Sequence, residues 1–120
     1  MQIQLAVAST SELVVIPGKL AEMKVGSSRI AYVYLDVPNH IELQSLRTPA
    51  TKRGTGSARA AMVEFLKQTD KAGLDVKLLA SPLDRKTRID KLVAFYASFG
   101  FEVTGRGNMA GEPNMLRKHR

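Results

Sequence analysis

A basic, glycine-rich stretch from Thr51 to Met62 (TKRGTGSARAAM) holds the residue types that most directly suggest chemistry. Gly54 and Gly56 stand where a helix is expected to begin, although glycine weakens a helix. The first backbone N–H groups of a helix have no internal partner, and the helix dipole adds partial positive charge there. Bare backbone at such a point, flanked by Arg53 and Arg59, is typical of a phosphate site.

The two commonest phosphate motifs do not match this stretch. No Gly-Lys-Ser/Thr follows the glycines, so the sequence is not a nucleotide P-loop. The run GTGSAR lacks the last glycine of a dinucleotide fingerprint, and the acidic residue at a suitable distance, Asp75, precedes its expected strand instead of ending it. On the residues alone, a tight turn into a helix with incidental arginines stays open as the alternative.

The elements before the stretch are expected to form a β-hairpin. Residues 30–37 (IAYVYLDV) are apolar and rich in strand formers, and residues 41–48 (IELQSLRT) alternate in polarity after a Pro-Asn-His turn. The alternation predicts three side chains on each face of the second strand: Ile41, Leu43 and Ser45 on one, and Glu42, Gln44 and Leu46 on the other.

Two helices are expected after the hairpin. The first runs from about residue 56 to 71 and ends at Gly73, a typical C-terminal cap. The second follows residues 84–87 and ends at Gly100. Its apolar stripe at helical spacing consists of Ile89, Leu92, Val93, Tyr96 and Phe99.

The remaining elements are short. Three further strands are expected at 76–80, 101–103 and 115–118. The part of the chain up to Arg29 is interpreted as a weak strand at 3–8, a strand or buried turn at 13–17, and one or two helical turns at 19–24. The terminal run RKHR is expected to be frayed and solvated. The order predicts one α/β domain with a mixed sheet over residues 1–120.

Composition limits the classes of function. The 120 residues include no cysteine, which excludes a disulfide scaffold, a thiolate metal site and a cysteine nucleophile. The two histidines are isolated, so no metal site is expected. No apolar run approaches the length of a membrane span, and no signal peptide is recognised, so a cytoplasmic protein is expected. The net charge of +7 attracts polyanions without selecting among them.

Two motifs together resemble a known family. The run Arg53-Gly54-Thr55-Gly56-Ser57-Ala58 resembles the acyl-CoA-binding motif Arg-x-x-Gly-x-Gly/Ala of the GNAT N-acetyltransferases. The run FYASFGF, residues 95–101, resembles their second signature, Tyr-x-x-x-Gly-Phe. The motifs occur in the family's order with a strand between them, and the resemblance extends from Ile30 to about Lys118. Compact phage-encoded members look similar in length and in the run KLVAFYASFGFEV.

The resemblance implies a GNAT-like mixed sheet flanked by helices, with an abbreviated N-terminal half, and acetyl-CoA as the acyl donor. It places the CoA pyrophosphate on the backbone amides of the first motif, with added charge from Arg59. It places the pantetheine arm near Leu46 and Thr48, through main-chain groups. No metal is implied.

The resemblance also implies catalytic residues. Acetyl transfer to an amine needs a base for the ammonium proton and an acid for the departing thiolate. Tyr96 stands where many members have the acid, and Glu42, on the strand before the glycine-rich loop, stands where some have the base. A core aromatic for Tyr96 and a solvated strand residue for Glu42 stay open as alternatives.

The sequence departs from the family at two places. Ile89 stands where the family often has an asparagine, and the first strand and two helices that usually bind the acceptor are abbreviated. Two explanations stay open: a partner subunit in a homodimer completes the acceptor site, or the substrate is large.

The sequence therefore predicts an N-acetyltransferase for a small-molecule or protein amine. One alternative is a non-catalytic binding or inhibitory module of the same fold. A nucleic-acid binder is less favoured, because the seven aromatic residues mostly occupy core positions and not exposed stacking platforms.

Overall fold

The structure, a computed structural model, describes residues 11–48, 56–81, 88–106 and 112–120. Within these residues the chain forms six strands and two helices. Their order is β1 (Leu20–Val25), β2 (Ser28–Asp36), β3 (Asn39–Arg47), α1 (Ser57–Lys71), β4 (Asp75–Leu79), α2 (Ile89–Ala97), β5 (Glu102–Arg106) and β6 (Pro113–Arg117). The α/β class and the hairpin of the second and third strands are confirmed.

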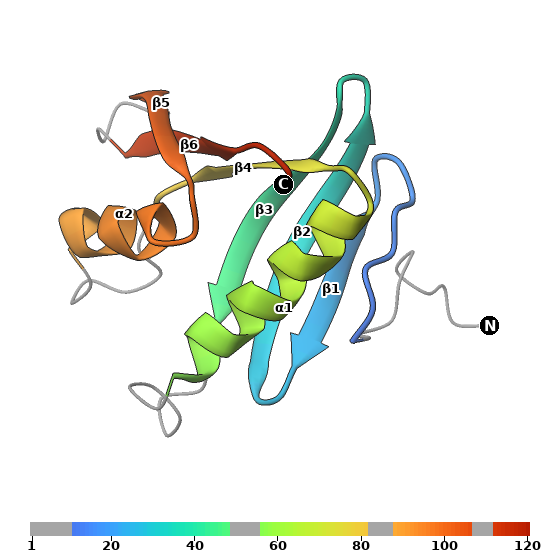
Figure 1. Cartoon of the computed structure of the whole chain (residues 1–120), viewed down its shortest axis with the longest axis horizontal. Coiled ribbons are helices and arrows are strands. Elements are labelled where there is room, and N and C mark those ends of the chain that lie inside the picture. Colours follow the sequence, from blue (N-terminus) through green and yellow to red (C-terminus); the bar gives the residue numbers. More distant parts are fainter. Residues whose placement is uncertain (1–10, 49–55, 82–87, 107–111) are drawn as a thin grey trace.

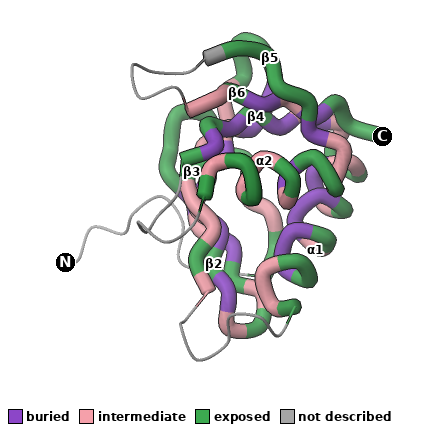
Figure 2. The backbone as a smooth tube through the Cα atoms, turned by 90° about the vertical axis from the view of Figure 1, so that its left-hand side faces the viewer, coloured by how far each residue is buried: buried purple, intermediate pink, exposed green. Residues whose placement is uncertain are grey.

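The six strands form one mixed sheet in the order β1-β2-β3-β4-β6-β5 (Figure 1). All neighbours are antiparallel except β3 and β4, which are parallel and joined by the α1 crossover. Both helices lie on one side of the sheet, and no described helix covers the other side (Figures 1 and 2). The fold is therefore two-layered around the β3–β4 pair.

The core lies between α1 and the sheet, where the buried segments of both face each other (Figure 2). Helical spacing puts Met62, Phe65 and Leu66 of α1 on the face that is turned to the sheet, and all three are buried. The Phe65 ring packs against Tyr32 of β2, with 5.6 Å between ring centroids. Burying each large apolar side chain stabilises the fold by about 1.5–3 kcal/mol.

The expectation of helical turns at residues 19–24 is wrong, because these residues belong almost entirely to the edge strand β1. Ala21 and Met23 are buried while Leu20 and Lys24 are exposed, which is the two-residue period of a strand. The strand pairs with β2 through a tight turn at Gly26. The expected strand at 3–8 lies outside the described residues.

Residues 13–16 form neither the strand nor the buried turn that the sequence left open. Val15 and Ile16 are exposed, and Pro17 makes a single bridge to Tyr34. The backbone N–H groups of Leu13 and Val14 instead donate to side chains of α1 and β2.

A β-bulge in β3 overturns part of the predicted alternation. Leu43 pairs with Tyr32 and Ser45 with Ala31, so Gln44 is an extra residue without an opposite partner. Because directly paired residues share a face, the insertion moves Ser45 to the outer side of the sheet and Leu46 to the core side, where it packs against buried residues. The prediction that Leu46 lies with Glu42 is therefore wrong.

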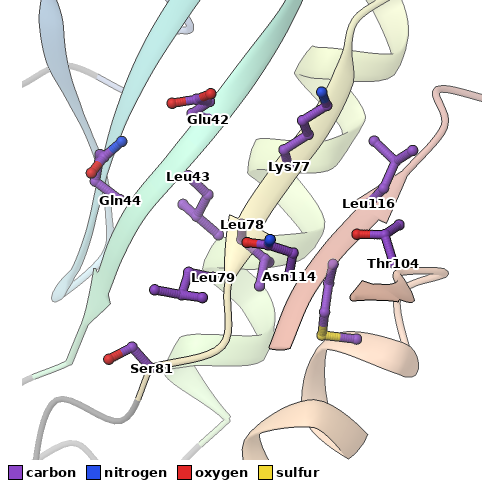
Figure 3. Close-up of a pocket in the computed structure, with 11 residues that line it drawn as sticks. Glu42, Leu43, Gln44, Lys77, Leu78, Leu79, Ser81, Thr104, Asn114 and Leu116 are labelled. Atoms are coloured by element: carbon purple, nitrogen blue, oxygen red, sulfur yellow. The ribbon is translucent and has the colours of Figure 1, made fainter. Parts of the chain in front are cut away.

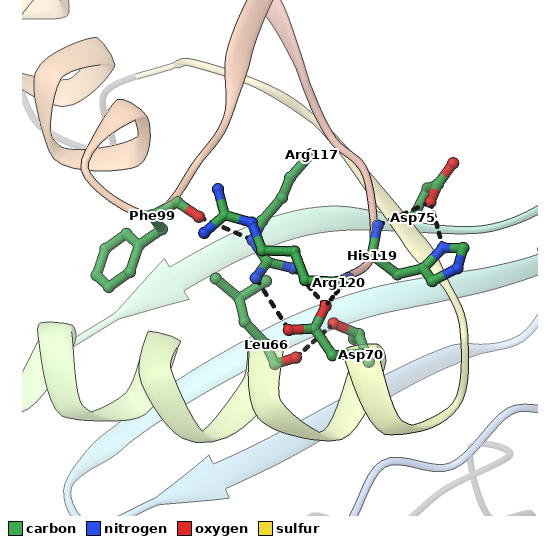
Figure 4. Close-up of polar contacts among 8 residues, drawn as sticks. Leu66, Asp70, Asp75, Phe99, Arg117, His119 and Arg120 are labelled. Atoms are coloured by element: carbon green, nitrogen blue, oxygen red, sulfur yellow. Dashed lines mark hydrogen bonds and ion pairs between the residues drawn. The ribbon is translucent and has the colours of Figure 1, made fainter.

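The expectation that the C-terminal residues are frayed is wrong, because they are tied to α1 and β4 (Figure 4). Arg117, whose side chain is 6% exposed, donates from both terminal nitrogens to the Asp70 carboxylate at 2.6 and 3.0 Å and from Nε to the Phe99 carbonyl. The backbone N–H of Arg120 also donates to Asp70, and that of His119 donates to Asp75. These hydrogen bonds lower the pKa of both carboxyl groups.

Candidate functional site

The start of α1 explains why a glycine stands at the mouth of the helix. Gly56 is the N-cap residue and has φ of +86°, a left-handed conformation that costs other residues about 1–2 kcal/mol. Its carbonyl accepts the first helical hydrogen bond, from Ala60. Ser57, Ala58 and Arg59 form the first turn, which contains no acidic residue. Arg53, Gly54 and Thr55 of the predicted motif lie outside the described residues.

The parallel strands β3 and β4 separate as they run toward this end of the molecule. They pair over only four positions, from His40 opposite Asp75 to Leu43 opposite Leu78, and the bulge at Gln44 follows at once. The bulge interrupts β3 at the point where pairing with β4 stops. The structure thus opens the sheet beside its one parallel pair, at the same end as the N-terminus of α1.

A pocket of about 640 Å³ lies at this separation, on the side of the sheet away from α1 (Figure 3). Its polar lining comes from the strands β3, β4, β5 and β6 and from the segment that follows β4. The polar lining residues include Glu42, Gln44, Lys77, Ser81, Thr104 and Asn114. Apolar side chains such as Leu43 and Leu79 also line it. The pocket can take a flexible chain with both apolar and hydrogen-bonding groups.

Glu42 lies in this pocket and contacts a buried histidine. The Glu42 side chain is 44% exposed, whereas His40 is 5% exposed, and 3.3 Å separate Glu42 Oε2 from His40 Nε2. The His40 Nδ1 atom lies 2.5 Å from the Pro38 carbonyl, which can only accept, so Nδ1 carries a hydrogen. The contact therefore places the Nε2 edge of the imidazole against the Glu42 carboxyl group at the pocket.

Sequence reasoning assigned no role to His40. The signal that could have found it is the strand period: His40 and Glu42 are two residues apart, so both side chains stand on the same face of β3.

Tyr96 lies in α2, is 7% exposed, and joins the core. Its ring packs edge-on against Phe95 and Phe101, with centroid distances of 5.4 and 5.7 Å. Burial raises the pKa of the Tyr96 hydroxyl to about 12, so the group stays protonated at neutral pH. The Tyr96 hydroxyl has no hydrogen-bond partner among the described residues. Every fully buried side-chain oxygen of these residues does have a partner, so the Tyr96 oxygen is not fully buried.

The structure does not bring every predicted site residue together. Tyr96 does not line the Glu42 pocket. Thr48 follows β3, and its hydroxyl is hydrogen-bonded to Ser28 at 2.8 Å. Arg59 stacks on Phe95 and Phe99 and donates to Ser98, so it joins α1 to α2.

The described residues contain neither a metal-binding cluster nor a membrane-spanning helix. No group of three or more histidine, aspartate or glutamate side chains in these segments is placed to hold a metal ion. Neither α1 nor α2, the helices of the described segments, has the length and apolar character that crossing a membrane requires.

Comparison with solved structures identifies the fold. The anti-CRISPR protein AcrVA5 is similar with a TM-score of 0.62 at 17% identity, over 78% of this chain and 94% of that one. The histone acetyltransferase HPA2 and related acetyltransferase from Corynebacterium glutamicum gives 0.63 at 15% identity, over 78% of this chain and 58% of that one. The PaiA N-acetyltransferase from Thermoplasma acidophilum, in complex with coenzyme A, gives 0.56 at 18% identity, over 76% and 52%.

The chain therefore has the fold of the GNAT acetyltransferases, in a compact form with a short N-terminal half. It spans nearly all of AcrVA5 but only about half of the two larger acetyltransferases. No protein-family model matches the sequence, and no curated protein sequence does.

Proposed function

We propose that this protein is an N-acetyltransferase that moves the acetyl group of acetyl-CoA to an amine. The observation that carries the proposal is the opening between the parallel strands β3 and β4 beside a helix that begins at a left-handed glycine. The fold, shared with acetyltransferases of which one was solved with coenzyme A, supports the same conclusion.

The residues around the opening suit the parts of the donor. The first turn of α1, with Gly56 to Ala58 and no acidic side chain, suits the pyrophosphate. The end of β3, with the backbone of Leu46 and Thr48, runs along the route from this helix to the pocket and suits the pantetheine arm. Arg53 to Thr55 remain predicted pyrophosphate ligands.

Glu42 is proposed as the base, with His40 holding it. An ammonium acceptor must lose a proton before its nitrogen attacks the thioester carbon and the carbon–sulfur bond breaks. The carboxylate of Glu42 is the acidic group that lines the pocket, and His40 fixes one of its oxygens.

Tyr96 is proposed as the acid that protonates the departing CoA thiolate. With a pKa of about 12 the hydroxyl carries its proton across the neutral range, and burial makes it a weaker acid than a free phenol. Because Tyr96 does not line the Glu42 pocket, this role requires that the thioester sulfur lies on the α2 side of the opening.

The proposal is tested by titrating the protein with acetyl-CoA calorimetrically and by following thiol release with a panel of amines. Tyr96→Phe keeps the ring that packs in the core but removes the proton, so kcat is expected to fall about 10–100-fold while the Kd for acetyl-CoA stays unchanged. Tyr34→Phe, which removes a hydroxyl bonded to Asn39, is the matched control and should leave kcat unchanged. Failure of acetyl-CoA to bind at millimolar concentration would exclude the function.

The burial of Tyr96 favours one alternative, a non-catalytic binding module of the same fold. That alternative predicts tight acetyl-CoA binding without thiol release for any amine in the panel. The thiol-release assay therefore separates the two functions.

A further inference from the structure

Three basic side chains form one row across the first three strands, at the end of the sheet where β3 and β4 separate. Lys24 of β1 is directly opposite Arg29 of β2, and Arg29 is directly opposite Arg47 of β3. Directly opposite residues have Cβ atoms about 4.5–5.5 Å apart, and like charges in such pairs destabilise a sheet. A row of three cations is therefore an arrangement that folding alone does not favour.

No described residue forms an ion pair with this row. All three residues are exposed, and none takes part in an ion pair or side-chain hydrogen bond to a described residue. The acidic residue nearest along β1 is Glu22, two positions before Lys24, and it has an interaction of its own. The other ion pairs of the structure show that this chain does pair its charges elsewhere, as at Asp70 and Arg117.

The row and the pocket lie on the same side of the sheet. Glu42 pairs with Val33, and Arg47 pairs with Arg29, four positions earlier on β2, so their side chains share a face. This is the face that no described helix covers. The distance from Glu42 to Arg47 corresponds to about 15 Å along the strand.

We propose that the row formed by Lys24, Arg29 and Arg47 binds acidic side chains of a peptide or protein acceptor whose amine enters the Glu42 pocket. The inference rests on the proposed function and names its substrate class. An extended peptide covers the distance of about 15 Å between Glu42 and Arg47 with roughly four to five residues. The acidic side chains are therefore expected at this number of residues before or after the reactive amine. A nucleic acid suits the face less well, because no aromatic side chain among the described residues is exposed as a stacking platform.

The test measures binding of fluorescent peptides by anisotropy, in the presence of CoA, so that it does not depend on turnover. Each peptide has one lysine, a spacer of three neutral residues, and then a pair of Glu, Gln or Lys residues. The Glu peptide is expected to bind the wild-type protein at least fivefold more tightly than the Gln peptide at low salt, and the difference should shrink when the salt concentration is raised well above physiological.

Charge reversal assigns the preference to the row. In the double variant Arg29→Glu, Arg47→Glu the order of affinities should invert, so that the Lys peptide binds most tightly. Lys67→Glu, on the exposed face of α1, is the matched control and should keep the wild-type order. All variants should keep the wild-type Kd for acetyl-CoA, which separates failure of this inference from failure of the proposed function.

Two results would overturn the inference. One is equal affinity for the three peptides, or a preference for acidic peptides that survives charge reversal. The other is binding of a single-stranded oligonucleotide that depends on the row and is tighter than that of the Glu peptide, which would assign the row to nucleic acid.

Discussion

The two ends of the sheet are built in opposite ways. At the closed end, where α1 finishes, β3 and β4 are paired and Asp70 and Asp75 are matched by Arg117 and His119 (Figure 4). At the open end, where α1 begins, the same two strands separate around a pocket (Figure 3). The row of Lys24, Arg29 and Arg47 at this end forms no ion pair with a described residue.

The difference in charge pairing between the two ends indicates which end stabilises the fold and which end can bind a ligand. Carboxylates matched by buried or backbone donors hold the C-terminus against α1 and β4 at the closed end. The open end instead carries cations without an ion-pair partner among the described residues, a helix N-terminus and a bulge. Each of these leaves charge or backbone groups that a ligand can bind. Stability should therefore respond mainly to changes at the closed end, and ligand affinity mainly to changes at the open end.

The largest effect is expected from Asp70→Asn at the closed end. The variant leaves the buried guanidinium of Arg117 without its anion, which should lower the free energy of unfolding by about 3 kcal/mol. Urea denaturation at pH 7 measures the loss, and the acetyl-CoA affinity should be unaffected. Asp90→Asn is the control, because the Asp90–Arg88 pair is exposed and its loss should cost less than about 1 kcal/mol. Equal losses in both variants would contradict the distinction between the ends.

A smaller effect is expected from glycine substitutions at the two ends of α1. Gly56 and Gly73 both have positive φ, and an added Cβ would meet nothing within 4 Å at either position. Gly56→Ala and Gly73→Ala should therefore each lower the free energy of unfolding by about 1–2 kcal/mol through backbone strain alone.

Only Gly56→Ala should also weaken acetyl-CoA binding, by about tenfold, because the added methyl group stands where the pyrophosphate is proposed to approach the backbone. Calorimetric titration of both variants measures this difference. A comparable loss of affinity in Gly73→Ala would show that strain, and not access to the helix start, is responsible.

The smallest effect is expected at Asp75. The hydrogen bond from the His119 backbone holds the pKa of this carboxyl below its usual value of 3.8 in the folded protein. Its stabilisation is therefore present above pH 3.8 and is lost as the pH falls through the lower, folded-state pKa. Asp75→Asn should cost at most about 1 kcal/mol at pH 7, because its side-chain partners Lys118 and His119 are substantially exposed. Thermal unfolding between pH 2 and 7 should show the difference from wild type vanishing at the acid end.

The sequence predicted the elements whose periodicity runs over many residues. The helix from Gly56 and its end at Gly73, the hairpin at residues 30–48 and the strand after α1 follow from side-chain spacing and glycine positions, which are local properties. The edge strand β1 was missed because a short strand with only two buried side chains gives a weak alternation.

The candidate site was predicted less completely. Glu42 was found in the correct strand, and the two-residue spacing would also have placed His40 on its face. The orientation of the imidazole, which is set by the Pro38 turn, does not follow from spacing. The bulge was also missed, because an unpaired residue is a property of two strands together. The tie between Arg117 and Asp70 joins residues far apart in the chain, so only the fold reveals it.

Gln44 has a consequence that extends beyond the gap it helps to open. Counted by strict alternation from Ile41 and Leu43, Arg47 would point toward α1, into the interior. The one inserted residue reverses this phase, and Arg47 instead emerges on the outer surface beside Arg29. Deletion of one residue in β3 is therefore expected to remove both the separation of the strands and the electropositive stripe. The two features would be gained or lost by the same single change.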